Sequence, residues 1–350
     1  MSEKKQKTEV STVKKTDTGK KKTSELALKL TVSSSPHVRS AETTTGIMLD
    51  VIISLLPALI ASVIIFGART LAVVATSVIS CVLAEYLSRK AMKKEQTITD
   101  LSAVVTGILL AYNLPAGIPL YIVVIGAIAA IVVAKQMFGG LGQNFVNPAL
   151  LGRIVLMVSF PTKMTTWAMP GNDVTVTGAT PMSYLKHKDL ASLPAFKEMF
   201  LGLHGGSLGE VCAAALLLGG IYLVIRKVIS PVIPCFYVGT VAILMLIAGK
   251  GDWSYVLYEI LGGGLLLGAI FMATDYTTSP ITTKGKIIYA VGAGCITCLI
   301  RLFGSLPEGV SFSIILMNIL TPLIDRSTYP TPFGTVKEKK AKKEKGDEKA

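Results

Sequence analysis

The sequence carries little charge for its length. Only 16% of its 350 residues are charged, whereas 51% are hydrophobic and the mean hydropathy is +0.58. A soluble domain usually contains about 25% charged residues. The composition therefore excludes an ordinary soluble enzyme and predicts an integral membrane protein.

Histidine and cysteine are also scarce. The three histidines, His37, His187 and His204, are scattered without ligand spacing, so no metal site is predicted. The five cysteines lie in apolar segments, which indicates no disulfide framework. Cys295 and Cys298 supply only two ligands, and we expect them to pack as small hydrophobic side chains in a helix.

Lysine gathers at the two ends of the chain and accounts for most of the net charge of +13. We predict a disordered basic tail over 1–45 and a second basic tail over 327–350. Basic segments beside spanning helices stay in the cytoplasm. Both termini are therefore predicted to be cytoplasmic, with membrane lipid rather than nucleic acid as the surroundings.

Ten apolar runs predict ten membrane-spanning helices. The fifth has only thirteen residues, which suggests a broken or re-entrant helix. The runs are Ile47–Phe66, Leu71–Leu87, Leu101–Leu114, Ile118–Ala134, Pro148–Phe160, Val211–Ile225, Val232–Ala248, Tyr255–Ala273, Ile287–Phe303 and Val310–Ile324.

The predicted fold is an all-α polytopic membrane protein with two five-helix halves, 46–160 and 210–326. The strong basic clusters follow the even-numbered spans, which places them on one side of the membrane. The polar segment 161–209 between the halves is then extracytoplasmic. Because each half has an odd number of spans, a repeat relating them would be inverted, as in many transporters.

The external segment contains Thr177-Gly178-Ala179-Thr180-Pro181. By itself this pattern is typical of an exposed turn, because glycine permits positive φ and proline fixes the next φ. Three further stretches are distinctive together. They are Thr99–Gly107 entering the third span, Gly139–Ala149 before the fifth, and Met272–Pro280 after the eighth.

With these motifs, the chain from Gly46 to Arg326 resembles the RnfD family, the membrane-embedded D subunits of the Rnf electron-transport complex. The B subunit of the sodium-pumping NADH:quinone reductase is a more distant member. The resemblance implies an ion-translocating (Na⁺ or H⁺) ferredoxin:NAD oxidoreductase complex in the plasma membrane of a prokaryote. The other Rnf subunits are the implied partners, and the chain alone should not turn over NADH.

The resemblance also implies two flavins. FMN would be joined to Thr180 by a phosphoester bond that a separate flavin transferase makes from FAD and Mg²⁺. The implied attachment motif comprises Asp173, Thr177, Gly178 and Ala179, although Asp173 stands four residues before Thr177 where the family pattern has three. A non-covalent riboflavin is implied within the membrane part, near Asn144–Asn147 or Thr277–Pro280.

Several polar residues at the span boundaries are either ordinary helix caps or parts of an intramembrane flavin or ion site. They are Asp100, Ser102, Thr106, Asn144, Asn147, Asp275, Thr277 and Ser279. The alternative function is a solute channel or secondary transporter of urea-transporter-like fold. A structural scaffold for partner subunits is a third class. Flavin content distinguishes the redox subunit from both the transporter and the scaffold.

Overall fold

The computed structural model divides the chain into two units, 1–41 and 42–350, and every residue that it describes lies in the second. Most of the two predicted tails lies outside the described residues. The described ranges are 42–171, 177–187, 193–210, 212–304 and 309–330.

Four helices are long and apolar enough to cross a membrane. At about 1.5 Å per residue, their 19 to 23 residues extend over roughly 28 to 35 Å. Thr43 and Thr282 cap two of them by accepting backbone N–H groups of the first turn. The four are α1 (Thr44–Phe66), α2 (Arg69–Ala91), α13 (Thr283–Phe303) and α14 (Val310–Thr328).

The other apolar helices of the described chain have only 10 to 17 residues. The eleven residues of α3 extend only about 17 Å, so the third predicted span does not cross about 30 Å of hydrocarbon as one helix. These helices are α3 (Ser102–Tyr112), α4 (Leu120–Ile128) with its π-helical continuation η2 (Ala129–Gln136), α5 (Pro148–Ser159), α9 (Ala213–Ile225) and α10 (Val232–Ala248).

The eighth predicted span is broken rather than continuous. The helix α11 (Trp253–Leu261) is followed by α12 (Leu265–Leu267) and the π-helical η4 (Gly268–Met272), with a bend of 62° between them. Gly263 and Gly264 have φ of +69° and +66°. Glycine adopts this left-handed conformation without the steric cost of a Cβ, which explains why the break falls at the glycine run.

The segment between the two sets of helices contains a small sheet, an exception to the all-α prediction. Trp167 of β1 pairs with Gly178 of β2 in an antiparallel register. Short elements complete the described chain: η1 (Ile98–Asp100), α6 (Pro161–Met164), β1 (Trp167–Ala168), β2 (Thr177–Gly178), α7 (Pro181–His187) and α8 (Phe196–Leu201).

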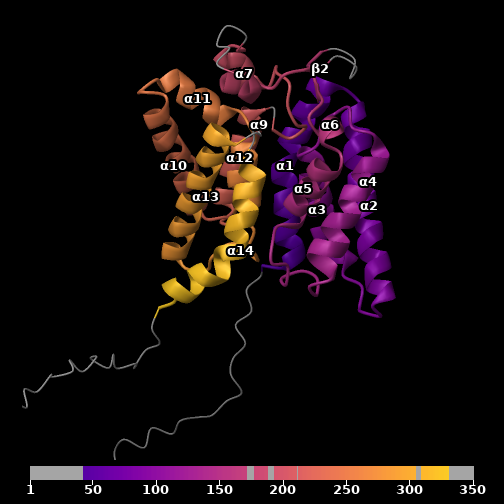
Figure 1. Ribbon diagram of the computed structural model, residues 1–350. Coiled ribbons are helices and arrows are strands. Elements are labelled where there is room, and N and C mark those ends of the chain that lie inside the picture. Colours follow the sequence, from indigo (N-terminus) through magenta and orange to yellow (C-terminus); the bar gives the residue numbers. More distant parts are fainter. Residues whose placement is uncertain (1–41, 172–176, 188–192, 211, 305–308, 331–350) are drawn as a thin grey trace, which may run out of the picture. The chain divides into compact units, whose positions relative to one another are not determined.

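Within this unit, the helices α1–α5 gather on one side and α9–α14 on the other (Figure 1). The two sets meet where α1 packs on α9 and where α5 packs on α14. A Cβ on Gly219 of α9 would lie 2.1 Å from the Ser54 carbonyl of α1, so glycine permits this close approach. At the same junction Arg226 pairs with Asp50 at 3.1 Å.

Part of the connecting segment is buried between the helices. The residues 204–210 are all buried, and the N–H of Gly209 donates to the carbonyl of Tyr112 at 2.9 Å. The neighbouring Leu208 bonds both Leu114 and Ser62. These contacts fix the segment at the end of α3, on the same side as the C-terminal end of α1, where Gly171 donates to Ile65.

Candidate functional site

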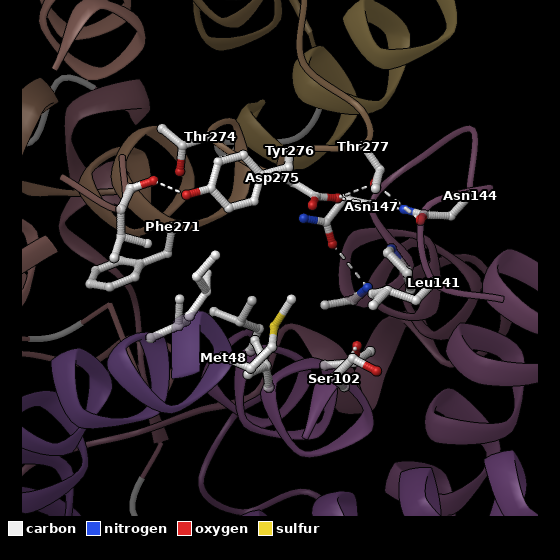
Figure 2. Close-up of a pocket in the computed structure, with 18 of the residues that line it drawn as sticks. Met48, Ser102, Leu141, Asn144, Asn147, Phe271, Thr274, Asp275, Tyr276 and Thr277 are labelled. Carbon is white, nitrogen blue, oxygen red and sulfur yellow. Dashed lines mark hydrogen bonds between the residues drawn. The ribbon is translucent and has the colours of Figure 1, made fainter. Parts of the chain in front are cut away.

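A cavity lies near the N-terminal end of α1, at a junction of helix ends (Figure 2). Its volume is about 100 Å³, less than the roughly 300 to 1,000 Å³ of small-molecule sites, and part of it is open to the exterior. Its lining includes apolar side chains of α1, α3 and α9. The polar groups come from the start of α3, from the end of η2 and the segment before α5, and from the segment after η4. The polar lining comprises Ser102, Thr106, Lys135, Asn144, Asn147, Thr274, Asp275, Tyr276 and Thr277.

Interrupted helices build this cavity. Leu101, with φ of +62°, turns the chain from η1 into α3. Asn147 caps α5 by accepting the N–H of Ala149 at 3.0 Å, and Pro148 occupies the first helical position, where no N–H is needed. The Asn147 side chain also donates to the carbonyl of Met272 at 3.2 Å. One amide therefore joins the start of α5 to the end of η4.

One wall of the cavity is a cluster of hydrogen-bonding side chains around Asp275 (Figure 2). The Thr277 hydroxyl lies 3.1 Å from Asp275 Oδ2 and 3.0 Å from Asn144 Oδ1. The hydroxyl of Thr278 and the amide of Asn144 also reach the carboxylate, at 3.3 and 3.5 Å. Burial raises the pKa of the Asp275 carboxyl above its usual value, although these hydrogen bonds oppose the shift.

The other wall carries a buried ammonium group. Lys135, which is 2% exposed, donates to Glu85 Oε2 at 2.8 Å and to Ser102 Oγ at 2.6 Å. Glu85 is fully buried and also accepts from Gln136 at 3.0 Å. The Nε of Arg89 lies 3.8 Å from the same carboxylate. Buried charges persist when they are paired and hydrogen-bonded, and this pair meets both conditions.

Our sequence interpretation missed Glu85 as a site residue and treated Lys135 only as an orientation signal. Glu85 lies inside the second apolar run and Lys135 directly follows the fourth, and charges at membrane depth mark functional positions. That pattern could have singled them out individually. Their contact could not be anticipated, because fifty residues separate them in the sequence.

The structure brings six of the eight predicted boundary residues to this one cavity. Asp100 stands just outside it and accepts from the Ser102 hydroxyl at 2.6 Å. Ser279 is buried beyond the lining, and its N–H donates to the Asp275 carbonyl. The six lining residues are Ser102, Thr106, Asn144, Asn147, Asp275 and Thr277.

The predicted attachment motif lies away from this cavity, in the segment that joins the two sets of helices. Thr180 precedes α7 and is only 4% exposed, whereas an exposed turn was expected. Its Oγ1 accepts the N–H of Ser183 at 3.3 Å. A Cβ on Gly178 would lie 2.4 Å from Met169 Sδ, so the flexible Met169 side chain would have to move for any larger residue. Ala179 is exposed, and Asp173 lies outside the described residues.

Comparison with known proteins decides the family. The NQR2, RnfD, RnfE family matches residues 31–334. The chain belongs to this family. It is 50% identical over 318 residues, 90% of this chain and 99% of the relative, to the D subunit of the Na⁺-translocating ferredoxin:NAD⁺ oxidoreductase complex of Acetobacterium woodii. It is 47% identical over 319 residues, 87% and 96% of the two chains, to the D subunit of the proton-translocating ferredoxin:NAD⁺ oxidoreductase complex of Clostridium ljungdahlii.

A more distant member of the family is the D subunit of the ion-translocating oxidoreductase complex of Stutzerimonas stutzeri. It is 37% identical over 330 residues, which are 82% of this chain and 91% of the relative. Family membership confirms the resemblance seen in the motifs, and the comparisons lend no support to a solute channel or secondary transporter. Among the described residues, no group of three or more His, Cys, Asp or Glu side chains is placed to hold a metal ion.

Proposed function

We propose that this chain is the flavin-carrying D subunit of an ion-translocating ferredoxin:NAD oxidoreductase complex in a prokaryotic plasma membrane. It would relay electrons through covalent FMN on Thr180 and a riboflavin bound in the cavity. The other Rnf subunits are the proposed partners, and a flavin transferase would attach the FMN. The observation that carries the proposal is the meeting of three separate family motifs around one cavity.

The residue types that line the cavity suit a flavin ring, although the cavity would have to widen to hold one. Met48, Val51 and Leu109 offer apolar surface for the faces of a planar aromatic system. Asn144 and Thr277 offer hydrogen-bonding groups of both kinds for its polar edge. A bound riboflavin would supply the electron chemistry, while the protein supplies position and electrostatics. The same polar wall, with its carboxylate and amide oxygens, is also a candidate cation site.

The Thr180 hydroxyl is the proposed phosphoester oxygen. Since Thr180 is buried, a transferase would reach the hydroxyl only while the segment around it is displaced from the helices. The cavity adjoins the N-terminal end of α1, whereas the segment that carries Thr180 bonds its C-terminal end. The two proposed flavins would therefore lie near opposite ends of the membrane part.

Ten crossings in two inverted halves remain our proposal for the topology. A similar arrangement of a buried cation beside an interrupted helix in each half supports this topology. In the first half Lys135, at the end of η2, holds the start of α3 through Ser102. In the second half Arg301, near the end of α13, holds the break before α12 through the carbonyls of Gly262 and Gly263. In each case the cation is also paired with a buried glutamate.

The topology predicts where reporter domains will be found. Reporters fused before Ser2 and after Ala350 are expected to read cytoplasmic, and one inserted near Asn172 to read external, because basic loops stay inside. Paired reporters, one active only in the cytoplasm and one only outside it, make the measurement. A cytoplasmic reading near Asn172 would contradict both the crossing number and the side of the proposed FMN.

Filling the cavity is expected to displace riboflavin. Met48 projects into the cavity (Figure 2), so Met48→Trp adds a large ring where the ligand would lie. The purified variant, made with its flavin transferase, should lose the non-covalent flavin, which denaturation releases. It should keep the covalent flavin, which stays with the denatured chain. Both are quantified by absorbance after acid precipitation.

The matched control for this variant is Leu49→Trp. Leu49 follows Met48 on the same helix but is 48% exposed and does not line the cavity. The control should retain both flavins. Equal release of non-covalent flavin from the wild type, Met48→Trp and the control would argue against riboflavin in this cavity.

A further inference from the structure

A continuous chain of hydrogen-bonding side chains leads out of the cavity. Its inner end is Lys135 Nζ, which donates to Ser102 Oγ at 2.6 Å. The Ser102 hydroxyl in turn donates to Asp100 Oδ1 at 2.6 Å. Lys135 and Ser102 both line the cavity. The three groups therefore connect the cavity, atom by atom, to a carboxylate outside it.

The outer end of this chain reaches solvent. Asp100 ends η1 and is partly exposed, next to the exposed residues 91–96 of the basic loop that follows α2. Lys135 is 2% and Ser102 4% exposed. Water therefore has access to the carboxylate but not directly to the ammonium group. This arrangement is typical of proton relays in membrane proteins, which link a buried group to the surface by titratable side chains.

Charged groups of both signs surround Lys135. From α2, Glu85 accepts its second N–H and Arg89 approaches the same carboxylate. Asp100 faces it through Ser102, and Asp275 stands on the other wall of the cavity. The ion pairs of Glu85 with Lys135 and Arg89 lower the cost of burying these charges.

We propose that Lys135, Ser102 and Asp100 form a proton path that delivers protons from water to the ligand in the cavity when that ligand is reduced. The inference rests on the proposed function, because it requires a redox ligand that becomes more basic on reduction. Electrons come from a one-electron donor outside this chain. The three side chains change only their protons.

Each transfer conserves protons along the path. Lys135 Nζ gives one proton to the basic atom of the reduced ligand, and the N–H bond breaks as the new bond forms. Lys135 regains a proton from the Ser102 hydroxyl. Ser102 is reprotonated by the Asp100 carboxyl, which takes its proton from water. Glu85 holds Lys135 in position throughout by its hydrogen bond.

The test measures proton uptake after rapid reduction. The full chain with its bound flavins is placed in lipid nanodiscs and reduced by a photochemically generated one-electron donor, while a pH-indicator dye reports protons leaving the medium. Ser102→Ala is expected to slow proton uptake by about 100-fold, the usual order for loss of a positioned proton-transfer group. Ser102→Thr keeps a hydroxyl and should restore the rate.

The equilibrium behaviour separates a path from a structural role. Ser102→Ala should leave the final number of protons taken up per bound flavin unchanged, because a path alters rates and not end states. Asp100→Asn should slow uptake as Ser102→Ala does. The matched control is Ser88→Ala, which removes a half-buried hydroxyl bonded only to its own helix. This control should retain the wild-type rate.

Two results would overturn the inference, and they are distinguishable. Normal proton uptake by Ser102→Ala with its flavin bound would refute the proton path and leave the proposed function standing. A wild-type chain that holds no non-covalent flavin would refute the riboflavin of the proposed function and the proton path with it.

Discussion

Thr180→Ala is expected to abolish covalent flavin completely. A phosphoester requires a side-chain oxygen, and alanine has none at this position. The loss of the Oγ1 hydrogen bond to the Ser183 N–H should cost about 0.5 to 2 kcal/mol, as for other caps of helix starts. The variant should therefore insert and fold. Intact-mass analysis of the chain, made together with its flavin transferase, measures the loss of one FMN.

Thr177→Ser is the control within the same motif, because the family pattern accepts either hydroxyl residue there. It should keep the FMN mass and in-gel fluorescence. An FMN-sized mass increase that persists in Thr180→Ala would assign the attachment to another residue. Loss of the flavin with undiminished electron flow through the whole complex would instead refute its role as an obligatory relay.

Arg301→Met is expected to be the most destabilising single substitution considered for this chain. Arg301 donates to Glu259 Oε2 at 2.9 Å and to the Glu259 carbonyl at 2.5 Å. Its side chain is 1% exposed and that of Glu259 is 4% exposed. Removing one partner leaves a buried charge without compensation, which typically costs about 3 to 5 kcal/mol of unfolding free energy. The thermal unfolding midpoint of the detergent-purified chain should fall accordingly.

The control exchanges the same residue types at an exposed position. Arg326→Met, at the solvent-exposed end of α14, should change the unfolding free energy by no more than about 0.5 kcal/mol. Glu259→Gln combined with Arg301→Met should recover part of the lost unfolding free energy, since a neutral amide then replaces the unpaired carboxylate. Equal stability of Arg301→Met and Arg326→Met would show that the Glu259 pair does not stabilise the break before α12.

The close agreement between sequence and structure is in the long apolar helices. Hydropathy alone predicted Val232–Ala248 to the residue, as α10, and placed the ends of α1 and α13 within four residues. Such runs can be predicted from sequence because the free energy of transfer into hydrocarbon is a property of each side chain and sums along the chain. The family was also evident from the sequence, because its motifs are local strings.

The broken elements were predicted less well. Hydropathy does not distinguish a straight span from one that bends at Gly263 and Gly264, since both have the same apolar content. The glycine run was the only local pattern that could have indicated the break. In a sequence, however, close packing between helices explains such a run equally well. Gly268 does serve packing, because a Cβ there would lie 2.3 Å from Val310 Cγ1.

The sequence by itself determined the membrane class of the chain, its family, and the types of residue at the boundaries of its helices. Only the tertiary structure decided which of those residues meet. Asn144 and Asp275 are 131 positions apart, and Glu85 and Lys135 are fifty apart, yet each pair shares a hydrogen bond. Periodicity and hydropathy indicate which side chains of a segment are buried and which are exposed to water or lipid. Contacts between distant segments depend on how the interrupted helices pack, which no local pattern encodes.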